Sequence, residues 1–385
     1  MKIATNITRS NVGGITVSNI NFLNSIHDTG KGVVAFELVS ARCLKGATAF
    51  SHFSSEWFEH NIINIFDKPI FRVIEKVKNI KELELEYRPI IDLIKKNLKE
   101  SGANVAFLNG TYYIPWLISI AASELKIPIV LRYAGVYSRE MDKFDIAPAT
   151  KKMFLEIEGS FQKTASYFIF PSTLCREEVK KQLLDDKQKE KMLKRSFVIP
   201  NPVNIPKGIK LAPNRERKIA AIGRWDPIKN FSAFFAIHKI LLKEKWPHQA
   251  KFVTVGGKIP SLPKTIDRLK SVPHGKIYEF YASQGLIISP STFETFGNVP
   301  MEAICLGVPV LINKNMGCAD VLKRVGLSEM VMSFDDLRAV AQRAKILCGS
   351  KIPEVKIKAI RKILNPENIN KRIMSVLRRA VKNKK

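Results

Sequence analysis

The stretch "GLIISPSTFETFGNVPMEAICLGVPVLINK", residues 285–314, decides the fold. It opens with a short, continuous apolar run, passes through a loop, and ends in a second apolar run, "VPVLINK". Short runs of this kind are typical of parallel strands that are buried on both faces, with helices as the crossovers. Pro300 suits the first turn of the crossover helix, which also carries Glu302. The stretch therefore predicts a strand, a loop, a helix and a second strand.

The same alternation extends along the whole chain of 385 residues, which is longer than a single hydrophobic core usually serves. The apolar runs outside the opening stretch are "MKIAT", "GVVAFELVS", "NVAFLNG", "IPIVLRYAG", "YFIFPS", "RKIAAIGRW" and "KFVTVGG". Longer helical patterns separate them. The sequence predicts the α/β class, with two doubly wound parallel sheets.

Composition marks the domain boundaries. Residues 198–218 hold four prolines and no helical period, which is typical of an interdomain segment. We therefore expect a first domain over 1–200, a linker over 201–218 and a second domain over 219–365. We expect residues 366–385 to form a basic helix that packs back on the first domain.

The net charge of +28 is uneven, with +7 in residues 1–200 and +21 in residues 201–385. Such an excess attracts phosphate-rich partners, whether nucleic acid, anionic lipid or nucleotide, although a solvated basic face is the alternative. No recognition-helix, zinc-finger or RNA-binding signature favours nucleic acid. The basic carboxyl-terminal segment could lie on an anionic membrane surface.

The five cysteines form no C-x-x-C pair, so neither a zinc site nor a disulfide framework is indicated. His52 and His60 have no carboxylate partner in register and are no metal site. The sequence shows neither a signal-peptide pattern nor an 18-residue apolar run, so we expect a cytoplasmic protein, with peripheral attachment to the inner membrane face as an option.

The loop of the opening stretch leads onto a helix amino terminus, where free backbone N–H groups favour an anion such as phosphate. Gly297 would let that anion approach the backbone closely. Glu294 and Glu302 lie on either side and could accept hydrogen bonds from sugar hydroxyls. The alternative is that Glu302 is a first-turn glutamate favoured by the helix dipole and Glu294 a solvated loop acid.

Two other loops carry related signals. Arg224 and Lys229 follow a strand in "AAIGRWDPIKN", and two cations there suit a pyrophosphate, although a helix-flanking pair is the alternative. Gly13 and Gly14 follow the first strand, where a turn without side chains lets a ligand approach. A simple strand-to-helix connection would look the same.

Taken together, these motifs resemble the retaining glycosyltransferases of the GT-B fold, specifically the family 4 class, also called group 1. The resemblance covers nearly the whole chain, and its pattern is a glycine pair, a "GR…K" loop and "PS…E-x-F-G…E-A…G-x-P-V". The matching residues are Gly13, Gly14, Gly223, Arg224, Lys229, Pro290, Ser291, Glu294, Phe296, Gly297, Glu302, Ala303, Gly307, Pro309 and Val310.

The resemblance implies a nucleoside-diphosphate sugar donor, a retaining reaction, and no metal or other cofactor. Arg224 and Lys229 would hold the diphosphate, Glu302 the ribose hydroxyls and Glu294 the donor sugar. Arg224, Lys229 and Glu294 are thus the candidate catalytic residues. The other candidate donor-binding residues are Gly13, Gly14, Gly223, Phe296, Gly297, Asn298 and Glu302.

The chain departs from the pattern in one respect, because it has no histidine between His60 and His238, where many relatives carry one. Arg132, Tyr133 or Asn109 could contact the sugar or acceptor instead. The acceptor stays open between a surface glycan, a lipid-linked sugar and a nucleic-acid base. Aromatic residues in 50–73 could form an exposed platform for a lipid or the core of one or two helices. A nucleotide-sugar epimerase or a binding protein of the same fold remains a further alternative.

Overall fold

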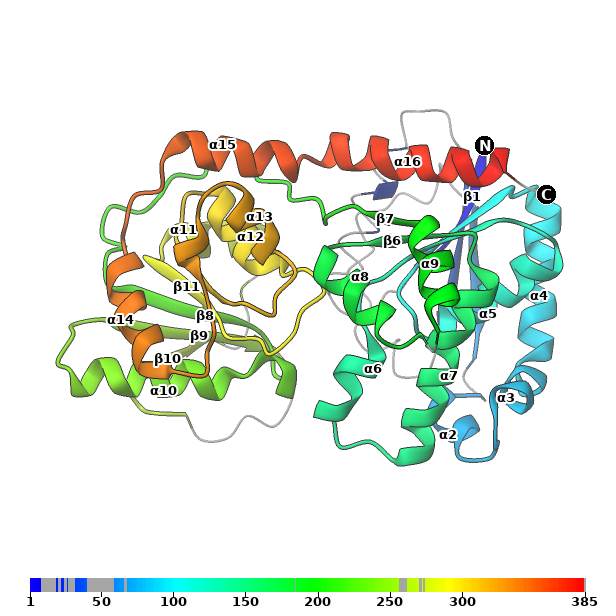
Figure 1. Cartoon of the computed structure of the whole chain (residues 1–385), viewed down its shortest axis with the longest axis horizontal. Coiled ribbons are helices and arrows are strands. Elements are labelled where there is room, and N and C mark those ends of the chain that lie inside the picture. Colours follow the sequence, from blue (N-terminus) through cyan, green and yellow to red (C-terminus); the bar gives the residue numbers. More distant parts are fainter. Residues whose placement is uncertain are drawn as a thin grey trace. The chain divides into compact units, whose positions relative to one another are not determined.

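The structure, a computed structural model, describes residues 1–7, 19, 22, 23, 26, 32–39, 59–65, 68–183, 185–255, 262–269, 272 and 274–383. These residues divide into two compact units (Figure 1). Unit 1 contains residues 1–171, 175–200 and 366–385, and unit 2 contains residues 172–174 and 201–365.

Unit 1 is built on a parallel sheet of seven strands in the order β3-β2-β1-β4-β5-β6-β7. The strands are β1 (Lys2–Ile7), β2 (Gly32–Val39), β3 (Glu59–Asn64), β4 (Val105–Asn109), β5 (Ile129–Arg132), β6 (Tyr167–Phe170) and β7 (Ser196–Val198). The chain adds β2 and β3 on one side of β1 and β4 to β7 on the other. The strand order therefore reverses between β1 and β4, which is the switch point of the sheet.

The helices of unit 1 pack against both faces of this sheet, which explains why its inner strands, such as β4 and β6, are buried along their whole length. They are α2 (Ile70–Ile74), α3 (Ile80–Glu86), α4 (Arg88–Ser101), α5 (Tyr113–Glu124), α6 (Tyr137–Glu140), η3 (Met141–Lys143), α7 (Pro148–Thr164), α8 (Thr173–Lys180), α9 (Asp186–Lys194) and α16 (Pro366–Lys382).

The carboxyl-terminal helix α16 belongs to unit 1 and contacts β4 and β5 (Figure 1). Its apolar face, which includes Ile373 and Leu377, is buried in one core with Ile3, Val105 and Val130 of the sheet. Its charged side chains lie on the opposite face, which is the arrangement that an amphipathic surface helix adopts.

Unit 2 is built on a second parallel sheet, with six strands in the order β10-β9-β8-β11-β12-β13. The strands are β8 (Lys218–Arg224), β9 (Gln249–Val255), β10 (Ile266–Leu269), β11 (Leu286–Ser289), β12 (Val310–Asn313) and β13 (Val331–Met332). Here the strand order reverses between β8 and β11. The opening stretch of sequence supplies β11, β12 and the helix between them.

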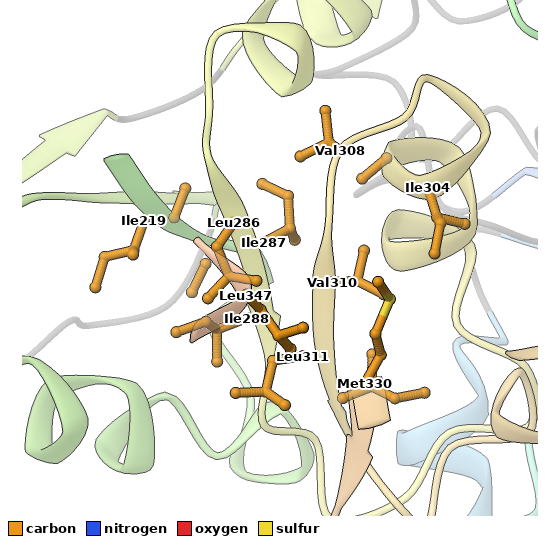
Figure 2. Packing of buried hydrophobic residues seen from close by; sticks show 14 of the residues in the cluster. Ile219, Leu286, Ile287, Ile288, Ile304, Val308, Val310, Leu311, Met330 and Leu347 are labelled. Atoms are coloured by element: carbon orange, nitrogen blue, oxygen red, sulfur yellow. The ribbon is translucent and has the colours of Figure 1, made fainter. Parts of the chain in front are cut away.

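Helices lie on both faces of this sheet as well (Figure 1). They are η4 (Pro227–Lys229), α10 (Phe231–Lys243), η5 (His274–Lys276), α11 (Ile277–Ala282), α12 (Asn298–Cys305), α13 (Ala319–Arg324), η6 (Ser328–Met330), α14 (Leu337–Leu347) and α15 (Glu354–Ile363). Figure 2 shows aliphatic side chains of β11 and β12, such as Ile287 and Leu311, packed among those of neighbouring elements.

Two doubly wound parallel sheets confirm the predicted α/β class and the GT-B type of fold. Four strands were missed by the sequence analysis, namely β3, β7, β10 and β13. β7 and β13 have only three and two residues, and β3 has a single buried residue, Ile63, so none carries a continuous apolar signal. Part of the stretch 50–73 is therefore strand β3 rather than helix.

Of the aromatic residues in that stretch, only Phe71 lies within the described residues. It is exposed on α2, with its ring edge-on to Phe154 at 5.9 Å between centroids. The other five aromatic residues of the stretch 50–73, Phe50, Phe53, Trp57, Phe58 and Phe66, lie outside the described residues, so the proposed platform stays a prediction. Within the described part of the chain, no helix has both the length and the apolar character that crossing a bilayer requires.

Candidate functional site

The candidate site lies where β8 and β11 of unit 2 end. In open parallel sheets, ligands bind at the carboxyl ends of the strands beside the switch point. β8 and β11 pair only through Ile219 and Ala220, so the two strands part before their carboxyl ends. The end of β8 and the loops that follow the two strands hold four of the candidate residues, namely Gly223, Arg224, Lys229 and Glu294.

The loop after β8 is a short turn that is fixed by Asp226. The Asp226 carboxylate accepts a hydrogen bond from the Lys229 backbone N–H at 3.1 Å and so caps η4, with Pro227 in the first position. Arg224 is the last residue of β8, and its guanidinium is 72% exposed and 3.9 Å from Asp226. The turn therefore leaves Arg224 exposed to solvent and directs the Lys229 side chain back over Gly223 of the strand.

Lys229 and Glu294 form the centre of the site. The Lys229 Nζ lies 2.9 Å from Glu294 Oε1, and both side chains are about four-fifths buried. Ser291 Oγ donates a second hydrogen bond to the same Glu294 oxygen at 2.7 Å. The Lys229 stem passes close to Gly223, where a Cβ would lie 3.0 Å from the Phe231 ring. A side chain at this position would press on the Phe231 ring, whereas the lysine stem would lie at ordinary van der Waals distance.

Backbone hydrogen bonds tie the two loops together. The Thr292 N–H donates to the Ile228 carbonyl at 2.8 Å, and the Asn230 amide donates to the Pro290 carbonyl at 3.3 Å. Asn230 has a left-handed conformation with φ of 49°, which asparagine tolerates better than most residues. The Lys229–Glu294 pair is thus held by the backbone on both sides.

The amino terminus of α12 follows directly. Gly297 caps this helix with φ of 109°, in the region that favours glycine. A Cβ there would lie 2.8 Å from Met316 and 2.9 Å from Cys318, so the position has neither the conformation nor the space for a side chain. The Phe296 ring is buried, which leaves only its backbone for a ligand.

Asn298, the first residue of α12, makes a contact that the sequence did not indicate. Its side-chain oxygen accepts a hydrogen bond from the Asn201 amide at 2.9 Å. Asn201 stands 97 residues earlier in the chain, so no local pattern could have found this pair. The contact orients Asn298 at the opening of the helix.

Glu302 lies one turn inside α12 and is partly buried. Its Oε2 accepts a hydrogen bond from the Tyr281 hydroxyl of α11 at 2.8 Å. Burial raises the pKa of Glu302, while the Tyr281 hydrogen bond opposes that shift. Among the described residues, no contact joins Glu302 to the Lys229–Glu294 pair. The structure therefore brings Lys229 and Glu294 together, leaves the Arg224 guanidinium exposed beside Asp226, and places Glu302 separately on the helix.

The predicted contacts in unit 1 lie at the carboxyl ends of β4 and β5. Arg132 is buried, and desolvation lowers its pKa to about 10. The Tyr133 ring is also buried and stacks on Phe170 at 4.8 Å. Asn109 binds Asn6 through its backbone. Gly13 and Gly14 lie outside the described residues.

Several supporting residues of the site were missed by the sequence analysis. Asp226 could have been found, because an aspartate directly before a proline is a common start of a helical turn. Tyr281 and Asn201 could not, since each meets its partner only through the tertiary fold.

Two Rossmann-like units, each with a parallel sheet and a switch point, are the components of the GT-B fold. Residues 216–349, most of unit 2, match the family model described as "Glycosyl transferases group 1". The likeness to group 1 glycosyltransferases that the sequence predicted is thereby confirmed for this part of the chain.

A protein of Klebsiella pneumoniae described as "Uncharacterized 41.2 kDa protein in cps region" is 25% identical over 129 residues. The match spans 32% of this chain and 35% of that protein, so it covers about a third of each.

Solved structures resemble the chain over nearly its full length. Sucrose-phosphate synthase from Thermosynechococcus elongatus has a TM-score of 0.71 at 16% identity, and the match covers 98% of both chains. The structure described as "Trehalose-6-phosphate from E. coli bound with UDP-2-fluoro glucose" has a TM-score of 0.66 at 12% identity, covering 98% of this chain and 99% of that one. At these identities the likeness shows the fold.

Proposed function

We propose that the protein is a retaining glycosyltransferase that moves a sugar from a nucleoside-diphosphate sugar to a hydroxyl acceptor. The observation that carries the proposal is the Lys229–Glu294 pair beside Arg224 at the switch point of unit 2. A cation pair suits a diphosphate, and a carboxylate held beside it suits sugar hydroxyls. The family match of residues 216–349 supports the same reading.

The two cations would act on the leaving group. As the bond between the anomeric carbon and the diphosphate oxygen breaks, negative charge grows on the diphosphate, and preorganised positive groups stabilise that charge. Lys229 is already positioned by Glu294 and by the η4 turn. Arg224 is exposed and can swing onto the same phosphates. The free N–H groups at the start of α12 would add to this stabilisation.

The reaction conserves the anomeric configuration in a front-face substitution. The acceptor oxygen forms its bond to the anomeric carbon on the side from which the diphosphate departs. The acceptor proton passes to the departing phosphate oxygen, so the enzyme needs no protein nucleophile. We propose that Arg224 and Lys229 replace a divalent metal in this step, and that the transfer is insensitive to chelators.

The two glutamates would bind the donor's hydroxyls. Lys229 and Ser291 both contact Oε1 of Glu294, and within the described residues nothing contacts Oε2. That second oxygen can accept from a hydroxyl of the donor sugar. Glu302 would accept from the ribose hydroxyls, with Tyr281 holding its other oxygen.

For the acceptor, we propose a growing surface polysaccharide or a glycolipid at the cytoplasmic side of a membrane. The relative from the cps region of Klebsiella pneumoniae supports a polysaccharide. The basic half of the chain would also suit an anionic membrane surface or a nucleic-acid acceptor. No contact in the structure favours the nucleic acid.

Incubation of the protein with a panel of nucleoside-diphosphate sugars, with and without candidate acceptors, tests the proposal. We expect release of the nucleoside diphosphate that depends on one donor, rises with acceptor and persists in EDTA. Conversion of the sugar without any acceptor would instead identify an epimerase, and binding without turnover would identify a binding protein. Either result would contradict the transferase assignment.

A further inference from the structure

A second cluster of cations lies in unit 1, at the edge of the sheet opposite to the carboxyl ends of its strands. The amino ends of β5 and β6 and the last turns of α5, α7, α9 and α16 surround an open pocket with a volume of about 520 Å³. The pocket is lined by Lys126, Lys163, Lys194, Arg195 and Arg379, with Tyr167 among them. No acidic residue is part of this lining.

The cations of the pocket differ in whether they have hydrogen-bond or ion-pair partners within the protein. The Arg195 guanidinium donates to the Ala165 carbonyl at 2.7 Å and to the Gln162 carbonyl at 3.3 Å, so it caps the end of α7. Lys194 pairs with Glu190 at 2.6 Å on the surface of α9. These two side chains have a structural explanation.

The charges of the other three cations are not neutralised by a carboxylate in the described part of the chain. Within the described part of the chain, Lys126, Lys163 and Arg379 make no ion pair. Arg379 lies over the Tyr167 ring at 5.5 Å, which holds the guanidinium at the pocket wall without neutralising it. The Thr164 hydroxyl in the same wall is buried and has no hydrogen-bond partner.

Helix dipoles account for only part of this charge. Four helices end at the pocket, and each carboxyl terminus carries about half a negative charge. These four half-charges and the Glu190 carboxylate balance about three of the five cations. About two positive charges remain, which matches the charge of a phosphate monoester.

We propose that this pocket binds a phosphate-bearing anion, independently of the donor site in unit 2. The cations supply the charge, and the Asn383 amide at the rim, which donates to the Tyr167 hydroxyl at 2.8 Å, is a further polar group of the pocket. The ligand is either a soluble phosphate compound or the headgroup of an anionic phospholipid, since both present the same chemistry.

Lys126 offers a variant that separates binding from folding. Its backbone φ is 53°, in the region that favours glycine, so Lys126→Gly removes a cation and relieves strain at once. Lys245 shares this conformation, with φ of 52°, and lies at an exposed helix end in unit 2. Because Lys245 has the same conformation, the positive φ of Lys126 is not itself evidence for a ligand site. The same likeness makes Lys245→Gly a matched control.

The experiment compares the pocket variant Lys126→Gly/Lys163→Gln with the control Lys245→Gly/Lys239→Gln, both in a Lys229→Ala background that disables the donor site. One arm measures binding of inorganic pyrophosphate by calorimetry. The other measures sedimentation with vesicles of phosphatidylglycerol and phosphatidylcholine, with pure phosphatidylcholine as the neutral surface. Unfolding temperatures monitor the fold.

We expect the control to bind one of the two probes, and the pocket variant to bind that probe about tenfold or more weakly at low salt without a lower unfolding temperature. Loss in the pyrophosphate arm identifies a soluble ligand, and loss in the vesicle arm identifies a headgroup. Equal binding by the two variants, or binding of neither probe by the control, would overturn the proposal. The result does not depend on glycosyl transfer.

Discussion

The switch points of the two sheets have the same topology and opposite chemistry. In unit 1, β1 and β4 pair as far as Thr5 and Phe107, and the Asn6 amide then continues the ladder by bonding both the N–H and the carbonyl of Asn109. In unit 2, the space between the parting strands holds the Lys229–Glu294 pair. Among the described residues, a buried neutral amide bridges the strands at the first switch point, and a largely buried ion pair lies at the second.

The difference teaches that a fold supplies a place for a ligand and that the side chains decide whether one binds. A buried amide that satisfies backbone groups stabilises the sheet. A lysine and a carboxylate that could each be solvated elsewhere contribute little to stability. The proposed donor carries both phosphates and hydroxyls, so it would give this ion pair a role in binding.

The largest expected effect is on catalysis in unit 2. Lys229→Ala should reduce transfer by about 100-fold or more, because one preorganised charge at the leaving group is lost. Glu294→Ala and Arg224→Ala should also remove most of the transfer. Circular dichroism should show all three variants folded. Near-normal turnover in all three would refute the assignment of the site.

Gly297 tests whether the helix start of α12 is sterically fixed. Gly297→Ala should lower the free energy of unfolding by about 2–4 kcal/mol, because the new Cβ meets Met316 and Cys318 and φ is unfavourable. Gly102→Ala has a φ of 66° but no atom within 4 Å of the new Cβ, so it should cost only about 1–2 kcal/mol. If Gly297→Ala and Gly102→Ala lowered the free energy of unfolding in urea equally, the side chains around Gly297 would have to move aside at little cost.

Asn6 tests the closed switch point of unit 1. Asn6→Ala leaves the buried N–H and carbonyl of Asn109 without a partner and should cost about 2–3 kcal/mol. Asn109→Ala keeps those backbone groups paired, and the Asn109 Nδ2 has no hydrogen-bond partner to lose. Its cost should be smaller. Thermal unfolding that ranks the two variants in the reverse order would contradict the bridging role of Asn6.

The smallest effect concerns a buried carboxyl in unit 1. Glu158 accepts hydrogen bonds from the backbone of Tyr137 and Ser138, and burial raises its pKa to about 7. Because the unfolded carboxyl titrates near 4.5, the folded chain keeps this proton over a wider range. The associated stability is present at low pH and is lost as the pH rises through about 7.

The matched variant for Glu158 is Glu158→Gln, which stays neutral. Between about pH 5 and pH 8, the wild type should lose about 1–2 kcal/mol relative to Glu158→Gln in urea unfolding. A difference between the two proteins that does not change with pH would show that Glu158 ionises normally.

The sequence predicted the elements whose signal is local. Strands such as β8 and β11 are continuous apolar runs, and Gly297 stands before a helix with Pro300 in its first turn, so both could be read directly. β13 has two residues and β3 is mostly exposed, so neither carries the pattern of a buried parallel strand. Short edge strands owe their structure to pairing with a neighbour rather than to their own composition.

The features of the candidate site also divide into those that the sequence indicated and those that only the fold shows. The "GR…K" loop and the two glutamates were singled out from the sequence because their order and spacing resemble the pattern of group 1 glycosyltransferases. The pairing of Lys229 with Glu294, the capping by Asp226 and the Tyr281–Glu302 hydrogen bond required the fold. Sequence spacing alone did not distinguish the roles of Glu294 and Glu302. In the structure, Glu294 pairs with the Lys229 ammonium, whereas Glu302 accepts a hydrogen bond from the Tyr281 hydroxyl.

Binding of nucleoside diphosphates to the intact chain is the most direct test of the central assignment. Calorimetry with UDP, GDP, ADP, CDP and TDP should show that at least one binds to the wild type and that Lys229→Ala weakens it strongly. Lys239→Ala, a matched change on the exposed face of α10, should leave the affinity unchanged. Equal affinities for the wild type and Lys229→Ala would contradict a diphosphate site at the switch point of unit 2.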